Sequence, residues 1–147
     1  MAIYDYETYP PPSSNGNGGL GFIGMQRCLD CPSSPIADLA SRQAAQKWAT
    51  VFSLNEPDIN GISPAQAAAF HKQYINPLVI ILFPSHAHVY PQGYLLIYLK
   101  TLQAIKKAFP AVTSSGSAGQ GLDWLSQMIS ACGGNCYADY INLHWYG

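Results

Sequence analysis

Short apolar runs, separated by polar and turn-forming residues, divide the chain into predicted strands and helices. Residues 21–26 (GFIGMQ) and 50–54 (TVFSL) are predicted strands, and residues 111–113 and 139–146 are expected to add two more. Strands that alternate with helices predict βα units and a parallel sheet, and so an α/β fold. A complete (β/α)8 barrel needs about 250 residues. The 147 residues of this chain therefore predict a partial barrel with roughly half the strands.

Helices are predicted between these strands at residues 34–48, 63–76, 100–109 and 122–132. In the first, Ser34 is the expected cap. Its predicted apolar face recurs every four residues, at Ile36, Ala40, Ala44 and Trp48, with Leu39 beside them. In the second, Ser63 and Gln66 have the spacing of a capping box. The glycine pair after residue 132 is typical of a helix end.

The segment between Lys72 and Lys100 contains 27 residues without a formal charge. Its two apolar runs, residues 78–83 and 94–99, are each six residues long and are separated by proline, histidine and glycine. A membrane-spanning helix needs about 20 predominantly apolar residues. We therefore expect buried strands or an exposed apolar insertion here, and no membrane span.

Composition excludes several classes of protein. Charged residues make up 10% of the chain and hydrophobic residues 48%, which does not fit a disordered chain. The net charge is −1, so no basic surface for nucleic acid is expected. No sequence feature calls for an organic cofactor or a specific protein partner. His86 and His88 form an H-x-H pair, but no carboxylate accompanies them, so no metal site is predicted.

The four cysteines occur as two close pairs, Cys28 with Cys31 and Cys132 with Cys136. A four-thiolate zinc site and free thiols are alternatives, but the turn sequences around each pair favour local disulfides. Disulfides indicate an oxidising compartment. Residues 1–9 lack the basic and apolar regions of a signal peptide, so we expect the natural N-terminus to lie further upstream.

Glu56 is the strongest candidate for catalysis. It follows an apolar predicted strand within the sequence LNEPD, at the carboxyl end where parallel α/β folds place their active sites. A carboxyl group there can donate a proton to a leaving oxygen, and Asn55 beside it can bind a substrate hydroxyl. A turn carboxylate before the proline is the alternative. We expect Glu7 to be solvated and Asp58 to cap the turn that follows it.

A second candidate group is His144, Trp145 and Tyr146, at the end of the last predicted strand. Aromatic faces stack on sugar rings, and the polar tips of histidine and tyrosine offer hydrogen bonds. A buried aromatic cluster is the alternative for this group alone. Together with Glu56 it indicates carbohydrate chemistry.

Six segments resemble, in order, the fungal glycosyl hydrolase catalytic core of glycoside hydrolase family 128: FIGMQ, FSLNEPDINGISPAQAA, QYINPL, PAVTSS, GLDWLSQMISACGGNC and DYINLHWYG. The family includes β-1,3-glucanases and alkali-sensitive-linkage cell-wall proteins. The resemblance implies a (β/α)8 barrel, hydrolysis of β-1,3-glucan with retention, Glu56 as acid/base with Asn55 in support, and a substrate groove lined by residues 144–146. It also implies a full-length protein that is extracellular or in the cell wall.

The chain departs from the family pattern in two ways. The family nucleophile is a glutamate on a strand beyond HWYG, so residues 1–147 are expected to form an incomplete catalytic domain, nearly inactive alone. Residues 79–103 interrupt the resemblance, and we expect a segment foreign to the family there. The alternative function is a non-catalytic glucan-binding protein of the cell wall.

Overall fold

A parallel β-sheet forms the centre of the fold. The computed structural model describes residues 2–13, 18, 20–82 and 101–144. Its sheet has the order β1 (Ala2–Tyr4), β2 (Gly21–Met25), β3 (Thr50–Phe52) and β6 (Lys106–Lys107), with every pair parallel. The parallel sheet with its helices confirms the predicted partial α/β barrel, and β2 and β3 confirm the first two predicted strands. The sequence analysis did not predict β1.

Beyond β6 the sheet continues through isolated parallel bridges. Asn55 pairs with Ala111, Ala108 with Tyr140 and Val112 with Leu143. The predicted strand at residues 111–113 and the described part of 139–146 therefore run in the expected direction, but they pair at single positions. Residues 145 and 146 lie outside the described residues.

The first helical region differs in detail from the prediction. A 3₁₀ turn, η2 (Ile36–Asp38), leads into α1 (Leu39–Gln46). Ser34 is not its cap, because the Ile36 amide donates instead to the Asp30 carboxylate at 2.9 Å. The predicted apolar face is right in part: Leu39 and Trp48 are buried and Ile36 packs against the core. Ala40 and Ala44 are exposed instead, and Gln43 is buried.

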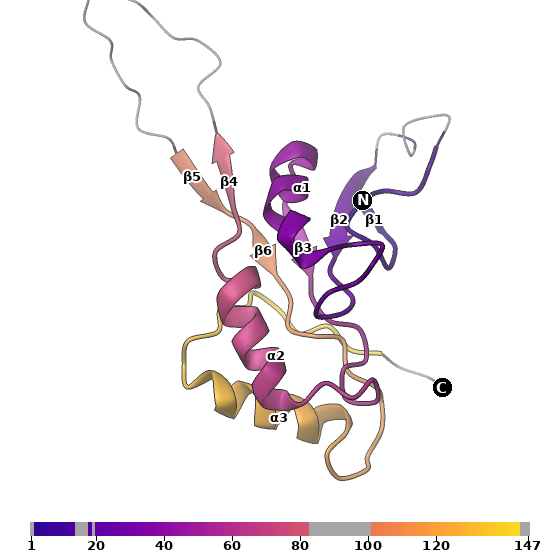
Figure 1. The fold of residues 1–147 in the computed structure, drawn as a ribbon, viewed down its shortest axis with the longest axis vertical. Coiled ribbons are helices and arrows are strands. Elements are labelled where there is room, and N and C mark those ends of the chain that lie inside the picture. The colour runs from indigo at the N-terminus through magenta and orange to yellow at the C-terminus, as the bar shows by residue number, and fades with distance from the viewer. Residues whose placement is uncertain (1, 14–17, 19, 83–100, 145–147) are drawn as a thin grey trace, which may run out of the picture.

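The next two helices confirm their predicted signals. In α2 (Pro64–Phe70) the capping box between Ser63 and Gln66 is complete, and a π-helical segment, η3 (His71–Ile75), continues it to Asn76. The last helix, α3 (Gly121–Cys132), ends at Gly133, whose positive φ of 58° is the left-handed conformation that glycine adopts readily. Figure 1 shows α2 and α3 packed against each other.

The predicted helix at residues 100–109 is wrong. Residues 101–104 form β5, which pairs antiparallel with β4 (Val79–Leu82), and β6 follows at once. Pairing with β3 buries Ile105 and Ala108, so the long-range contact overrides the local helical pattern. Figure 1 shows the β4–β5 pair leading away from the rest of the fold. Within the described residues, no helix has the length and apolar character to cross a membrane.

Both cysteine pairs form the local disulfides that the sequence predicted, Cys28–Cys31 and Cys132–Cys136. The zinc and free-thiol alternatives are therefore wrong. Across residues 2–13, 18, 20–82 and 101–144, no three metal-ligating side chains come together. His86 and His88 lie outside the described residues.

The apolar core lies between the sheet and the helices. Its largest fully buried side chains include Trp48, Leu54, Ile75 and Met128. The Trp48 ring occupies the space over Gly24 in β2, where an added Cβ would lie 2.5 Å from ring carbons. This packing holds the sheet rigid beneath the loops that follow its strands.

Candidate functional site

The loops after successive parallel strands meet at one edge of the sheet. Glu7 follows β1, Arg27 follows β2 and Glu56 follows β3, while Thr113 and His144 follow the bridged segments beyond β6. Because these segments are parallel, their carboxyl ends share one rim, which is where barrel enzymes place their catalytic groups. Glu56 therefore lies at the carboxyl end of a strand, as the sequence predicted.

Glu56 is held in an unusual backbone conformation. Its φ of 45° lies in the left-handed region, which costs a non-glycine residue of the order of 1 kcal/mol or more. Its amide donates to the Ala111 carbonyl at 2.7 Å, and its own carbonyl accepts from the amides of Ile59 and Asn60. These bonds fix the direction in which the side chain leaves the rim.

His144 contacts Glu56 directly. Its Nδ1 lies 2.9 Å from Glu56 Oε1, and both side chains are less than one-fifth exposed. The His144 amide donates to the Val112 carbonyl at 3.2 Å, which fixes the backbone beneath the imidazole. We expected His144 to line a substrate groove with Trp145 and Tyr146. The structure adds a contact between His144 and the candidate acid, while Trp145 and Tyr146 lie outside the described residues.

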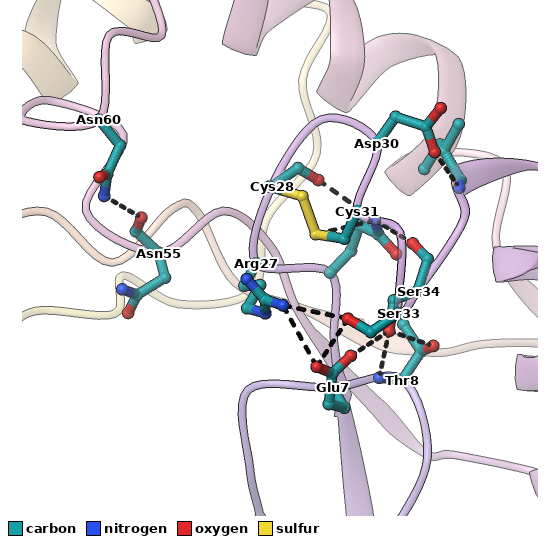
Figure 2. The surroundings of a disulfide bond; sticks show 12 residues. Glu7, Thr8, Arg27, Cys28, Asp30, Cys31, Ser33, Ser34, Asn55 and Asn60 are labelled. Carbon is teal, nitrogen blue, oxygen red and sulfur yellow. Dashed lines mark hydrogen bonds and ion pairs between the residues drawn. A yellow bond between two sulfur atoms is a disulfide. The ribbon is translucent and has the colours of Figure 1, made fainter.

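Asn55 lies beside Glu56 with its backbone fixed on both sides. Its amide donates to the Arg27 carbonyl at 3.0 Å, and its carbonyl accepts from Asn60 Nδ2 at 3.3 Å (Figure 2). Its side-chain Oδ1 is buried and has no hydrogen-bond partner within the described residues. A buried acceptor without a partner costs about 1–3 kcal/mol.

Glu7 is not the solvated carboxylate that we expected. Figure 2 shows it at the centre of a polar cluster beside the Cys28–Cys31 disulfide, where it accepts from Ser34, from Ser33 at 2.8 Å and from Arg27 at 3.3 Å. Burial alone raises the pKa of Glu7, but these hydrogen bonds and the Arg27 charge outweigh it and hold the pKa below its usual value of 4.5. The partners lie 20–27 residues away in sequence, so only the strand-end position of Glu7 could have indicated this role.

We expected Asp58 to cap the turn that follows it, but its partners lie in another loop. Its carboxylate accepts from the Thr113 hydroxyl at 2.6 Å and from the amides of Thr113 and Gly121. It thereby joins the loop after β3 to both ends of the next loop. Gly121 adopts a φ of 54° there, and an added Cβ would lie 2.2 Å from the Ser115 carbonyl oxygen.

Two hollows border the rim. One, of about 400 Å³, is lined in part by Arg27, Asn55 and Asn60. The other, of about 480 Å³, lies between the 113–117 loop, the start of α3 and His144. Asn55, which precedes Glu56 in the chain, lines the first hollow, and His144, which contacts Glu56, lines the second.

Comparison with known proteins finds similar glycoside hydrolases. The family model described as "Glycosyl hydrolase catalytic core" matches residues 83–147. The crystal structure of a GH128 (subgroup IV) endo-beta-1,3-glucanase from Lentinula edodes is 59% identical and covers 100% of this chain with a TM-score of 0.81. Over its whole length the chain is similar to this GH128 enzyme.

A curated protein and a second solved structure are also similar to this chain. "Alkali-sensitive linkage protein 1" of Schizosaccharomyces pombe is 35% identical over 103 residues, which are 67% of this chain and 14% of that protein. A GH128 (subgroup III) exo-beta-1,3-glucanase from Blastomyces gilchristii, crystallised with glucose, shares the fold at 23% identity and a TM-score of 0.68. The chain spans about half of each of these two GH128 structures, 49% and 51%.

The other acidic residues of this chain all have structural partners. The chain contains eight aspartates and glutamates. Besides Glu56, Glu7 and Asp58, each of the remaining five contacts a backbone amide or a basic side chain: Asp5, Asp30, Asp38, Asp123 and Asp139. Glu56 therefore differs from these carboxylates, because its side chain contacts a histidine.

Proposed function

We propose that this chain supplies the acid/base half of an active site that hydrolyses β-1,3-glucan with retention of configuration. Glu56 is the acid/base, and the nucleophile is a carboxylate outside the 147 residues. The observation that carries the proposal is the strand-end Glu56 held by His144 at 2.9 Å. Beside it lies Asn55 Oδ1, a buried acceptor without a partner among the described residues. The similarity to the Lentinula edodes protein, named as an endo-beta-1,3-glucanase, supports the substrate class.

In the first step the Glu56 carboxyl group protonates the glycosidic oxygen while the nucleophilic carboxylate attacks the anomeric carbon. The leaving sugar departs as an alcohol, and a glycosyl ester forms on the nucleophile. In the second step the Glu56 carboxylate removes a proton from water, which attacks the anomeric carbon and frees the nucleophile. The His144 contact keeps one oxygen of Glu56 in place, so the other oxygen carries the proton in both steps.

Residues 1–147 form one incomplete catalytic domain in this proposal, and residues 79–103 are a segment inserted between η3 and β6. The full-length protein acts outside the cell or in the cell wall. The two local disulfides support an oxidising compartment. The similarity to alkali-sensitive linkage protein 1 of Schizosaccharomyces pombe also supports this location. The proposed partner is the glucan itself, without a cofactor or a protein partner.

The test is designed around a complete domain. Residues 1–147 replace the corresponding segment of the Lentinula edodes enzyme, which this chain matches at 59% identity, and this protein is called the hybrid domain below. Hydrolysis of laminarin is compared with hydrolysis of an aryl β-laminaribioside whose activated phenol departs without protonation. Glu56→Gln in the hybrid domain is expected to slow laminarin hydrolysis by a factor on the order of 10²–10⁴. The first step on the aryl substrate is expected to stay fast, so the variant gives a burst of phenol followed by slow turnover.

Azide is expected to restore turnover of the aryl substrate by Glu56→Gln, with a β-glycosyl azide as product, since azide needs no general base. Asp38→Asn is the matched control, because Asp38 is exposed and its ion pair with Arg42 is on the outside of α1. Equal loss of both activities without rescue would assign Glu56 another role. Laminarin binding by an unmutated hybrid domain that releases no reducing ends would favour the glucan-binding alternative.

A further inference from the structure

The candidate acid and its histidine partner are both held by the same short segment, residues 111–113. The Ala111 carbonyl accepts from the Glu56 amide at 2.7 Å, and the Val112 carbonyl accepts from the His144 amide at 3.2 Å. Ala111 and Val112 are both fully buried. The 2.9 Å contact between the side chains of Glu56 and His144 therefore depends on how the loop that carries Glu56 lies against this segment.

Asp58 joins that loop to the third residue of the segment. Its Oδ2 accepts from the Thr113 hydroxyl at 2.6 Å and from the Gly121 amide at 2.8 Å, and both of its oxygens accept from the Thr113 amide at 3.3 Å. Asp58 and Thr113 are half-buried, and hydrogen bonds to a carboxylate are about twice as strong as those between neutral groups. The Asp58 carboxylate therefore fixes the loop after β3 against residues 111–113.

One rigid residue, Pro57, separates Asp58 from Glu56. Because the proline ring fixes φ at about −65°, a displacement of Asp58 is passed on to Glu56 rather than absorbed between them. Glu56 itself has a φ of 45°, a conformation that persists only where its surroundings enforce it. The backbone bonds that the Glu56 carbonyl accepts come from amides of its own loop, so they do not set the position of that loop relative to His144.

We propose that Asp58 is a positioning residue for acid/base catalysis: it holds Glu56 at the distance and in the direction from His144 that proton transfer to the glycosidic oxygen requires. The inference rests on the proposed function for the role of Glu56. Asp58 acts through the backbone of Glu56 and not on the substrate. A displacement of about 1 Å at a catalytic group can slow a reaction by about 10²-fold, so a residue that only holds the loop can control the rate.

The experiment uses Asp58→Ala and the milder Asp58→Asn in the hybrid domain. For each variant the kcat/KM for laminarin is divided by the kcat/KM for the aryl laminaribioside, whose phenol departs without protonation. We expect this ratio to fall by about 10-fold or more in Asp58→Ala. A smaller fall is expected in Asp58→Asn, which keeps one side-chain oxygen to accept from Thr113 or Gly121. A residue that only stabilised the fold would lower both rates together and leave the ratio unchanged.

Asp139→Ala is the matched control. The Asp139 carboxylate also accepts from a backbone amide of a neighbouring strand, that of Lys107 at 2.8 Å, but at the far end of the segment that leads to His144. This control is expected to lower Tm and to keep the ratio of the unmutated domain. In the Glu56→Gln background, Asp58→Ala is expected to cause little further loss of laminarin hydrolysis, because residues that act through one group do not contribute additively. A fully additive loss would overturn the inference.

A second measurement does not depend on turnover. Hydrogen exchange of the Glu56 amide, followed by NMR, reports its bond to the Ala111 carbonyl, and we expect exchange about 10-fold faster in Asp58→Ala than in Asp139→Ala. If Asp58→Ala does not fold, Asp58→Asn decides by the same two measurements. An unchanged ratio, or Glu56 exchange as slow as in the control, overturns the inference even if the unmutated hybrid domain hydrolyses laminarin. An unmutated domain without hydrolysis contradicts the proposed function instead, and the exchange rate then decides this inference alone.

Discussion

The Ser34 hydroxyl is expected to be one of the most important polar groups for the stability of the rim. Ser34 and Thr8 are both fully buried. The hydroxyl donates to Glu7 Oε2 and accepts from the Thr8 hydroxyl at 3.1 Å and the Thr8 amide at 3.3 Å. Ser34→Ala removes all three bonds at once and leaves a carboxylate oxygen and a buried amide without this partner.

The magnitude follows from these lost partners. An unpaired buried amide costs about 1–3 kcal/mol, and a lost hydrogen bond to a charged group costs about 1.5–3 kcal/mol. Allowing for relaxation, we expect Ser34→Ala to lower the free energy of unfolding by about 2–4 kcal/mol. In the hybrid domain this corresponds to a fall in Tm of about 5–10 °C. Ser33→Ala is the matched control: it also contacts Glu7, but it is exposed, so a fall of about 1–2 °C is expected.

The pH dependence gives an independent check. The folded state holds the pKa of Glu7 below its usual 4.5, so the stabilisation is complete above that pH and is lost as the pH falls through the folded-state pKa. Removing the Ser34 bond moves the folded-state pKa toward 4.5. The Tm difference between Ser34→Ala and the unmutated domain should therefore be largest near pH 7 and shrink below pH 4.5. A Tm difference that stays constant from pH 7 to pH 3, or equal effects of the two serine substitutions, would refute the reasoning.

Two further predictions concern the core. Gly24→Ala places a Cβ 2.5 Å from the Trp48 ring and should cost about 1–3 kcal/mol in unfolding experiments, whereas Gly21→Ala on the same strand meets no atom within 4 Å and should be nearly neutral. His71 is buried, and burial, together with the Lys107 charge, lowers its pKa below 6.5 although the hydrogen bond to the Tyr137 carbonyl opposes this. The unfolded chain then takes up a proton that the folded chain does not, so Tm should fall as the pH drops below 6.5, and His71→Gln should flatten that slope.

Local signals predicted the parts of the fold that local interactions form. The capping box at Ser63, the glycine after Cys132 and the two cysteine pairs act over three to five residues, and all have the predicted structure. Glu56 could be placed at the rim because an apolar run ends directly before it. In each case the partners are close in sequence, so the pattern contains the whole interaction.

Long-range pairing explains what the sequence analysis missed. Residues 101–104 form a strand because residues 79–82 pair with them, and the Lys107 side chain is buried because its Nζ donates to the Asn76 carbonyl at 2.7 Å. Neither partner is visible in a local helical pattern. The same reason applies to Glu7 and to Asp58, whose donors lie 20 to 63 residues away. A carboxylate in a polar segment gives no sign of such donors before the fold is known.

Under the proposed function, the contact between His144 Nδ1 and Glu56 Oε1 determines which tautomer of His144 is compatible with acid/base catalysis by Glu56. If His144 Nδ1 carried no hydrogen, a protonated Glu56 would donate from Oε1 to the imidazole, and its proton would be turned away from the substrate. With the hydrogen on Nδ1, Oε1 accepts in both protonation states of Glu56. The catalytic proton is then confined to Oε2, and it can pass to the glycosidic oxygen and return from water without rotation of the carboxyl group. Glu7, the carboxylate after β1, is surrounded by donors that hold its pKa below the usual value and favour its ionised form, so in the proposed mechanism the catalytic proton belongs to Glu56.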